Sequence, residues 1–360
     1  MNHPDVVLFF GTRPQVIKAC VMRPLLASRM SLVSVDTGQH YDYALNALLY
    51  EQLGVTAPDR FLEVGSGGHA QQTGTILERG EALLQQLRPR LVVVIGDTNS
   101  TLGGALAAAK LRIPVVHVEA GLRAQDALMA EEINRRVVDA VSSLLCTPSA
   151  TATRRLQRER PDAKVIETGD VAYDGFRRYV REVPRPIDVP SRYIFATLHR
   201  AELTDRPERL QRVMDALREL PLPVLLPLHP RTSMALHRAG IAPVDGQLRL
   251  MPPVGYFESL SLLQGAQTVI TDSGGVQREA YWSGIPCVTL RSETEWIETV
   301  ECGANVLVDP DLADADLKAV VLKRLAIPSM ASTWDVAAYG NGNAAERVAD
   351  AVADFLRASA

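Results

Sequence analysis

Short apolar runs alternate with longer segments of helical spacing along most of the chain. The runs at 6–10, 91–95 and 114–118 are rich in β-branched residues and are followed by glycine or polar residues, which is the pattern of buried parallel strands. Between the runs, apolar residues recur three and four positions apart, which predicts helices. Further strands are expected at 32–35, 165–167, 193–197, 224–226 and 267–270. The alternation predicts an α/β fold built from doubly wound, Rossmann-like sheets.

A proline-rich stretch divides the chain. Residues 180–191 hold three prolines among charged residues, which is typical of an interdomain linker. We therefore expect one Rossmann-like domain over residues 1–180 and a second over residues 191–343, facing each other across a ligand cleft. Residues 344–360 are expected to form a helix that packs on a domain surface, because their apolar residues recur at helical spacing.

Composition and charge exclude several classes of function. The net charge is −4 and no basic run is longer than a pair, so a nucleic-acid-binding surface is not expected. The sequence holds no membrane-spanning apolar stretch and no signal-type N-terminus, so we expect a cytoplasmic protein without membrane contact. The cysteines are scattered without metal-ligand spacing and are expected to be buried thiols rather than a metal site. They are Cys20, Cys146, Cys287 and Cys302.

A small, glycine-rich turn follows the strand expected at 267–270. The N–H groups of such a strand-to-helix turn favour an anion, so Ser273, Gly274 and Gly275 are candidates for a phosphate site. Glu279 follows about one and a half helical turns later, where its carboxylate can accept hydrogen bonds from sugar hydroxyls. This combination indicates a nucleotide ligand. The alternative is that Ser273 only caps a helix and the glycines only form a turn.

Polar residues also follow the other expected strands. Arg13 and Lys18 begin the first helix, where cations suit a diphosphate. Asp97 and Glu119 follow two successive strands, and the carboxyl ends of parallel strands share one edge of the sheet, so both carboxylates should face one crevice. His199 follows the first strand of the second half.

These residues suit acid–base chemistry on a diphosphate ligand. Asp97, Glu119 and Glu131 could remove a proton from carbon or return one, and His199 could stabilise a leaving phosphate. Structural roles are the alternative, with Asp97 and Glu119 as helix N-caps or as partners of Arg123. The sequence has neither GxGxxG nor GxxxxGK[ST], which argues against a nicotinamide cofactor and against an NTP-hydrolysing P-loop.

Ordered motifs along nearly the whole chain resemble the non-hydrolysing UDP-N-acetylglucosamine 2-epimerases. Their forms are most similar to the branch that includes bacterial UDP-2,3-diacetamido-2,3-dideoxyglucuronate 2-epimerases and archaeal UDP-N-acetylglucosamine 2-epimerases. The motifs are GTRP at 11–14, GQHYDY at 38–43, GDTNSTL at 96–102, HVEAGLR at 117–123, EEINR at 131–135, LHRAE at 198–202, LHPRT at 228–232, PPVGY at 252–256, TDSGG at 271–275 and SETEWIETVECG at 292–303.

The resemblance implies a GT-B-like pair of domains, a homodimer, and inversion at C2 of a UDP-amino sugar without a redox cofactor. The C2 proton leaves with UDP to give a bound glycal, and UDP then returns as a proton reaches the opposite face. By motif, Asp97, Glu119 and Glu131 match the catalytic acids and His199 the histidine near the diphosphate. The implied substrate-binding residues, with Glu279 on the ribose and Tyr256 near the uracil, are Arg13, Lys18, Gln39, Arg123, His229, Arg231, Tyr256, Ser273, Gly274, Gly275, Glu279 and Arg291.

Several positions depart from the family pattern. Gln15 stands where the family usually has glutamate, Ala130 replaces a common proline, and Leu203 replaces an asparagine. Leu128 replaces an arginine that could pair with a sugar carboxylate, so the expected reaction is UDP-N-acetylglucosamine to UDP-N-acetylmannosamine or a close derivative. Asp42 in the GQH segment argues against activation by the substrate.

Three alternative functions share the UDP site. A hydrolysing epimerase would release free sugar and UDP. A GT-B glycosyltransferase would use the same UDP site on an acceptor, but would leave the carboxylates at the strand ends without a role. A UDP-sugar sensor would have no catalytic activity.

Overall fold

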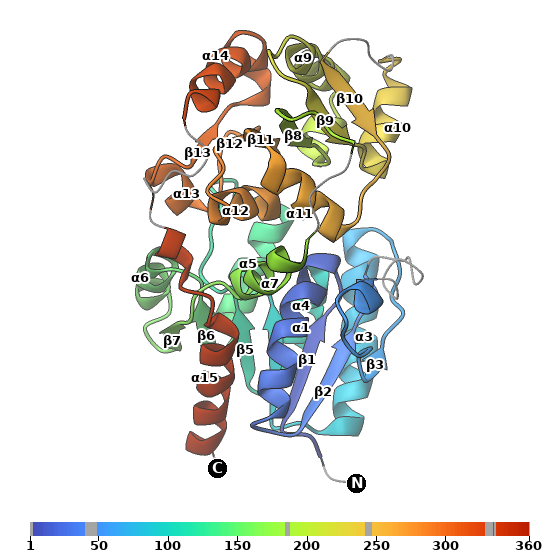
Figure 1. Ribbon diagram of the computed structural model, residues 1–360. Coiled ribbons are helices and arrows are strands. Elements are labelled where there is room, and N and C mark those ends of the chain that lie inside the picture. Colours follow the sequence, from blue (N-terminus) through green and yellow to red (C-terminus); the bar gives the residue numbers. More distant parts are fainter. Residues whose placement is uncertain are drawn as a thin grey trace. The chain divides into compact units, whose positions relative to one another are not determined.

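The computed structural model describes residues 3–39, 49–183, 188–241, 247–327, 334 and 336–359. The chain divides into two compact units, Met1–Arg178 with Ala337–Ala360, and Tyr179–Val336. Each unit has a parallel sheet connected by helices (Figure 1), so the α/β class expected from the sequence is confirmed. The chain returns to the first unit at residue 337, earlier than the boundary at 343 proposed from the sequence.

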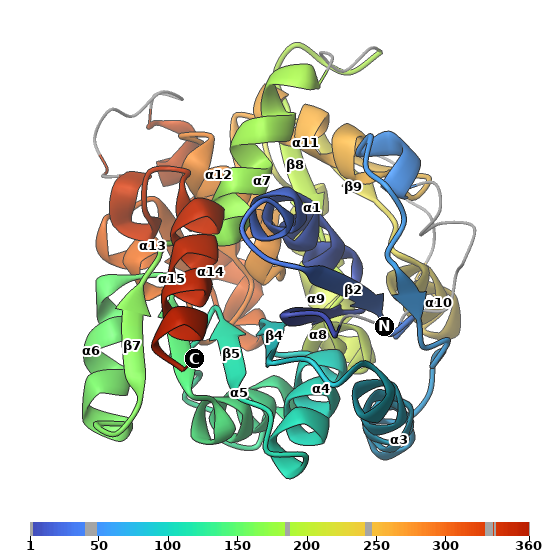
Figure 2. The same ribbon diagram turned by 90° about the horizontal axis from the view of Figure 1, so that it is seen from below.

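The first unit is built on a parallel sheet of seven described strands, in the order β3-β2-β1-β4-β5-β6-β7. Figure 2 shows α3, α4 and α5 on one face of this sheet and α1 and α15 on the other. The strands are β1 (Val6–Phe10), β2 (Leu32–Asp36), β3 (Arg60–Phe61), β4 (Leu91–Ile95), β5 (Val115–Val118), β6 (Leu144–Thr147) and β7 (Lys164–Glu167). The helices are α1 (Arg13–Ala27), α3 (His69–Leu87), α4 (Asn99–Lys110), α5 (Ala130–Val141), α6 (Ala150–Glu159), α7 (Val171–Tyr179) and α15 (Ala344–Ala358).

The central strands β1 and β4 are buried along their whole length, because helices cover both faces of the sheet. Small residues bring α4 close to its neighbours. A Cβ at Gly104 would lie 3.1 Å from Cγ of Phe9 in β1, and a Cβ at Gly103 would overlap Ile76 of α3. Larger side chains at these two positions would push α4 away from the core.

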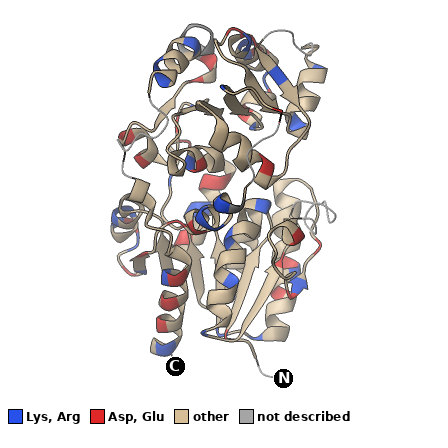
Figure 3. Cartoon of the chain, in the orientation of Figure 1, with Lys and Arg blue, Asp and Glu red and all other residues tan. Residues whose placement is uncertain are grey.

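The C-terminal helix α15 packs on α1 of the first unit. Its buried apolar face includes Val348, Val352 and Leu356, and charged residues lie along its length (Figure 3). The N–H groups of Ala344 and Ala345 donate to the Asp174 carboxylate over 3.1 and 2.7 Å, so α7 supplies the N-terminal cap of α15. Burial raises the pKa of Asp174 to about 6.

The second unit has a parallel sheet of six described strands, in the order β10-β9-β8-β11-β12-β13. Leu203 is buried in its main hydrophobic cluster, so this departure from the family pattern serves the core. The strands are β8 (Ile194–Thr197), β9 (Val224–Pro227), β10 (Leu248–Met251), β11 (Thr268–Thr271), β12 (Cys287–Thr289) and β13 (Asn305–Leu307). The α-helices are α8 (Ala201–Thr204), α9 (Pro207–Arg218), α10 (Pro230–Arg238), α11 (Tyr256–Gly265), α12 (Gly274–Trp282), α13 (Ile297–Glu301) and α14 (Ala313–Leu325).

The strand order reverses once in each sheet, between β1 and β4 in the first and between β8 and β11 in the second. Connections on either side of such a switch point run over opposite faces of the sheet, which leaves room for a ligand at the carboxyl ends of the two strands. Among the described helices, none combines the length and the apolar character that crossing a membrane requires.

The cysteine thiols lie away from solvent. Cys20, Cys146 and Cys287 are buried, whereas Cys302 is half-buried. Burial raises the pKa of Cys20 to about 11 and the pKa values of Cys146 and Cys287 to about 12. These three thiols therefore stay protonated and act as small apolar core residues at neutral pH.

Candidate functional site

Glu119 follows β5 in a left-handed backbone conformation, with φ of 71°. This conformation costs a residue with a side chain roughly 1–2 kcal/mol, so the surroundings of Glu119 must hold it in place. Glu119 is buried and accepts a hydrogen bond from Nζ of Lys18, which is also buried. Lys18 therefore lies inside the unit as the counter-ion of Glu119.

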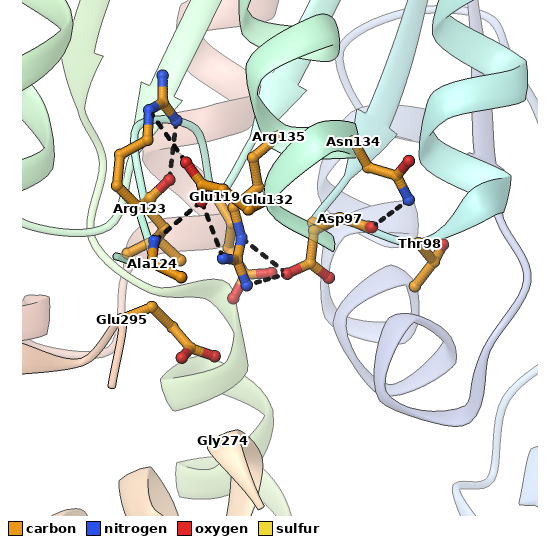
Figure 4. Close-up of polar contacts among 12 residues, drawn as sticks. Asp97, Thr98, Glu119, Arg123, Ala124, Glu132, Asn134, Arg135, Gly274 and Glu295 are labelled. Atoms are coloured by element: carbon orange, nitrogen blue, oxygen red, sulfur yellow. Dashed lines mark hydrogen bonds and ion pairs between the residues drawn. The ribbon is translucent and has the colours of Figure 1, made fainter. Parts of the chain in front are cut away.

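Asp97 follows the neighbouring strand β4 and pairs with Arg135 of α5. Nε and Nη2 of Arg135 lie 2.9 and 2.5 Å from Oδ2 of Asp97, as Figure 4 shows. Asp97 is partly exposed, with 30% of its side-chain surface accessible, whereas the side chain of Glu119 is only 4% exposed. The sheet thus carries two carboxylates at adjacent strand ends in different environments.

Gln15 connects the two turns beside the switch point. Its Oε1 accepts from the N–H groups of Gly11 and Thr12, over 2.9 and 3.2 Å. Its Nε2 lies 2.6 Å from the carbonyl oxygen of Ile95 and 2.9 Å from Oγ1 of Thr98. A carboxylate at this position could not donate to the Ile95 carbonyl unless it were protonated, so the amide suits this site.

The turn after β2 contacts the first turn of α4. Oε1 of Gln39 accepts from the N–H and hydroxyl of Ser100, over 3.0 and 2.7 Å. The hydroxyls of Thr37 and Ser100 lie 2.7 Å apart. The structure therefore brings Gln39 to the start of α4. His40 and Asp42 lie outside the described residues.

Arg123 and Glu131 have surroundings that differ from those of Asp97 and Glu119. Arg123 donates to Asp139 over 2.7 Å and to Glu159 over 2.6 Å, which makes it part of a buried ion-pair group. Glu131 is half-exposed in the first turn of α5, whereas its neighbour Glu132 is fully buried. Glu132 accepts from the N–H of Ala124 over 2.9 Å and also pairs with Arg135 (Figure 4).

The structural alternatives raised for these residues have mixed outcomes. The N-cap of α4 is Thr98 rather than Asp97, and Asp97 forms its ion pair with Arg135. Ser273, in contrast, does cap α12, because its Oγ accepts from the N–H of Val276 over 3.4 Å.

Asp272 and two histidines lie at the switch point of the second sheet. Oδ2 of Asp272 accepts from the N–H groups of His199 and Arg200, each over 2.8 Å, so it joins the ends of β11 and β8. Nδ1 of His199 lies 3.4 Å from the other carboxylate oxygen. The rings of His199 and His229 are 5.4 Å apart between centroids. The structure thus places both histidines at one edge of this sheet.

The turn at Ser273–Gly275 begins α12, as the phosphate-site hypothesis requires. A Cβ at Gly274 would lie 3.1 Å from Oε1 of Glu295, so this carboxylate lies against the first helical turn. Arg291 is buried beside it, with Nη1 3.0 Å from Oε2 of Glu295. An anion at this turn would therefore meet the helix N-terminus together with a neutralised ion pair.

Glu279 lies on α12 beside Arg278. Burial raises the pKa of Glu279 to about 7, although the charge of Arg278 opposes this shift. The Arg278 guanidinium stacks on the Trp296 ring, with Cζ 3.7 Å from the ring centroid. Burial and the charge of Glu279 also raise the pKa of Tyr256, so the predicted ribose and uracil residues share one environment.

Arg231 and Arg13 are the two remaining arginines among the predicted substrate-binding residues. Arg231 donates to Oγ1 of Thr204 over 2.9 Å and to Asp205 over 2.7 Å. Arg13 is exposed at the start of α1. Within the described residues, no group of three metal-ligating side chains could hold a metal ion.

The interpretation of the sequence missed several residues of these groups. Arg135 and Glu132 belong to the EEINR motif, in which they lie on neighbouring turns of one helix, and this spacing could have identified the pair. For Gln15, the sequence indicated only that the negative charge of the family's usual glutamate is absent. The stacking of Arg278 on Trp296 joins residues distant in sequence, and no local pattern indicates it.

The fold and the turns at its two switch points define the class as a two-domain α/β protein of the GT-B type. The chain belongs to the UDP-N-acetylglucosamine 2-epimerase family, whose family model matches residues 26–353. The family expected from the motifs is thereby confirmed, and with it the enzyme class, an isomerase that epimerises a UDP-sugar.

Named relatives cover almost the whole chain. The chain is 42% identical to the UDP-2,3-diacetamido-2,3-dideoxy-D-glucuronate 2-epimerase of Pseudomonas aeruginosa, over 97% of this chain and 99% of that protein. It is 36% identical to the UDP-N-acetylglucosamine 2-epimerase of Methanocaldococcus jannaschii, over 95% and 96%. A crystal structure of the M. jannaschii enzyme in complex with UDP-GlcNAc and UDP has a TM-score of 0.87 and covers 96% of this chain and 98% of that one.

Replacing Gly11 by alanine should destabilise the first unit. A Cβ at Gly11 would overlap the hydroxyl oxygens of Thr37 and Ser100, and overpacking of this kind costs about 1–3 kcal/mol. Gly74→Ala is the matched control, because that exposed glycine of α3 has open space around it and alanine favours a helix by about 1 kcal/mol. Thermal unfolding should show a lower midpoint for the first variant and an unchanged or higher one for the second. Equal midpoints would contradict the close packing.

Proposed function

We propose that the protein inverts C2 of a UDP-2-acetamido sugar, converting UDP-N-acetylglucosamine to UDP-N-acetylmannosamine or a close derivative. A carboxylate removes the C2 proton while the bond from C1 to the β-phosphate oxygen breaks, which leaves a glycal and UDP. UDP then adds back to C1 as a proton is delivered to the other face of C2. The sugar is neither oxidised nor reduced overall.

The observation that carries this proposal is the pair of carboxylates at the ends of β4 and β5. Glu119 is buried against Lys18, whereas Asp97 is partly exposed and pairs with Arg135. Two carboxylates at adjacent strand ends can reach a substrate carbon from different directions, as removal of a proton from one face and delivery to the other require. We assign these two residues, with Glu131, to proton transfer at C2.

The second unit is proposed to bind UDP. The turn at Ser273–Gly275 offers N–H groups to the diphosphate, and His199 at the neighbouring strand end can stabilise UDP as it leaves. Glu279 is assigned to the ribose hydroxyls and Tyr256 to the uracil. Arg13, Lys18, Gln39, Arg123, His229, Arg231 and Arg291 are the further substrate-binding candidates.

Two sugars are the leading candidates. The relatives include an enzyme named for UDP-2,3-diacetamido-2,3-dideoxy-D-glucuronate and others named for UDP-N-acetylglucosamine. Leu128 is 85% exposed and offers no charge to a sugar carboxylate, which favours the uncharged sugar.

The test is an NMR incubation in D2O with each UDP-sugar in a separate tube. Deuterium at C2 together with a new UDP-linked epimer would support the proposal and identify the sugar. Free sugar with UDP would indicate a hydrolysing epimerase instead. If neither tube shows exchange at C2, the proposed substrates are wrong.

We also propose that the protein is a homodimer, as the resemblance implies, and that it is cytoplasmic, as expected from the sequence. Light scattering coupled to gel filtration would test the assembly. A mass of one chain at micromolar concentration would contradict the dimer.

Glu119→Gln or Asp97→Asn should lower turnover by roughly 10²- to 10⁴-fold, the usual contribution of a general acid–base group. The dissociation constant of UDP should change by less than roughly tenfold, because proton transfer acts in the transition state. Glu167→Gln is the control, an exposed carboxylate at the end of β7. Initial rates and calorimetric UDP titration give both quantities. Full turnover in both site variants would remove the proposed mechanism.

The affinity for UDP should fall as the pH drops below about 7, the raised pKa of Glu279. Above this pH Glu279 is ionised and accepts hydrogen bonds from the ribose, whereas below it the protonated carboxyl accepts them less well. The expected loss relative to Glu279→Gln is about tenfold or less between pH 8 and pH 6.

The Glu279→Gln variant is the reference because both proteins experience the same titration of UDP itself. The ratio of the two dissociation constants, measured at pH 6, 7 and 8, isolates the carboxyl group. A ratio that stays constant would show that Glu279 does not bind the ribose as an anion.

A further inference from the structure

His117 lies between the two turns that carry Asp97 and Glu119. It is a fully buried residue of β5. Its Nδ1 is 2.7 Å from Oδ1 of Asp139, and its Nε2 is 2.7 Å from the carbonyl oxygen of Gly96. Each ring nitrogen thus has its own partner, one on α5 and one in the turn after β4.

Both partners of His117 are hydrogen-bond acceptors. A carbonyl oxygen carries no proton, and the Asp139 carboxylate already accepts from the N–H of Gly121 over 3.2 Å and from Arg123 over 2.7 Å. The Arg123 guanidinium and the Gly121 N–H both donate to Asp139, which favours its ionised, acceptor-only form. Both ring nitrogens of His117 must therefore donate.

We infer that His117 donates from both ring nitrogens and so positions Asp97 and Glu119, an inference that rests on their proposed acid–base roles. Its Nε2–H holds the Gly96 turn that precedes Asp97. Its Nδ1–H orients Asp139, which in turn holds the N–H of Gly121 in the turn after Glu119.

The conformation of both turns explains why such a clamp is needed. Gly96 has φ of 69° and Glu119 has φ of 71°, so each turn passes through the left-handed region. Glu119 pays a steric penalty there that other interactions must offset. The hydrogen bond to Gly96 fixes the backbone before Asp97, and the one to Gly121 fixes the backbone after Glu119. An error of about 1 Å in the position of a catalytic group can cost roughly 100-fold in rate.

Asp139 belongs to an ion-pair network that reaches Asp97. Ion pairs lead from Asp139 to Arg123, from Arg123 to Glu132 over 3.9 Å, and from Glu132 through Arg135 to Asp97. His117 donates into this network through Asp139 and contacts the turn before Asp97 through Gly96.

The charge can be tested directly by NMR of the full-length protein labelled with 15N-histidine. Two-bond proton–nitrogen spectra distinguish an imidazolium from either neutral tautomer. Loss of one signal set in His117→Gln identifies His117 among the seven histidines. We expect protonated chemical shifts for both ring nitrogens at the pH of the assay. The shift of an unprotonated nitrogen at either position would overturn the inference, whether or not the protein proves to be an epimerase.

Two substitutions separate the two bonds. The amide nitrogen of His117→Asn replaces Nδ1 and keeps the bond to Asp139, whereas that of His117→Gln replaces Nε2 and keeps the bond to Gly96. We expect kcat to fall roughly 10- to 100-fold in each variant, because each loses one of the two bonds that position the catalytic turns. The dissociation constant of UDP should stay within about threefold in both.

The controls distinguish positioning from a general loss of stability. His3→Gln changes an exposed histidine whose Nδ1 lies 3.0 Å from the carbonyl oxygen of Leu87, and its kinetics should equal those of the wild type. Thermal unfolding of each variant shows whether stability follows kcat. A wild-type kcat in both variants would overturn the positioning role. Wild-type protein that epimerises neither sugar would contradict the proposed function, while the NMR result would still decide the charge of His117.

Discussion

A buried polar side chain joins the turns at the switch point of each sheet. In the first sheet Gln15 connects the turn after β1 with the turn after β4. In the second sheet Asp272 connects the end of β11 with the backbone after β8. The backbone ladders pair β1 with β4 and β8 with β11, and these two side chains extend the connection into the turns that follow the strands. The turns that carry candidate residues are thereby tied to the sheet edge.

The residues at the carboxyl ends of β4 and β5 lower the stability of the first unit. Buried ion pairs seldom stabilise a fold compared with apolar residues of the same size, and a left-handed residue with a side chain adds strain. Asp97, Glu119 and Arg135 nevertheless share this region with His117 and Asp139. The cost is consistent with a site whose geometry matters more than its stability.

Local patterns predicted the strands that carry the site but not the contacts between them. The central strand Leu91–Ile95 was predicted with its observed bounds, because an unbroken β-branched run has few other interpretations. Short strands such as Arg60–Phe61 and Cys287–Thr289 were not predicted, since so few residues show no periodicity. Lys18 was expected to face a ligand from a helix mouth, yet it is buried against a residue about a hundred positions away. Only the fold brings such residues together.

The departure at Gln15 can now be understood from its position. A Cβ at Gly96 would lie 3.2 Å from Oε2 of Glu119 and 3.9 Å from Nε2 of Gln15, so both side chains border the same glycine. A second carboxylate here would repel Glu119 and compete for Lys18. The amide instead donates to the carbonyl of Ile95 and leaves Glu119 with Lys18 as its counter-ion. The neutral residue therefore keeps the bridge across the switch point while removing a negative charge from the neighbourhood of Glu119.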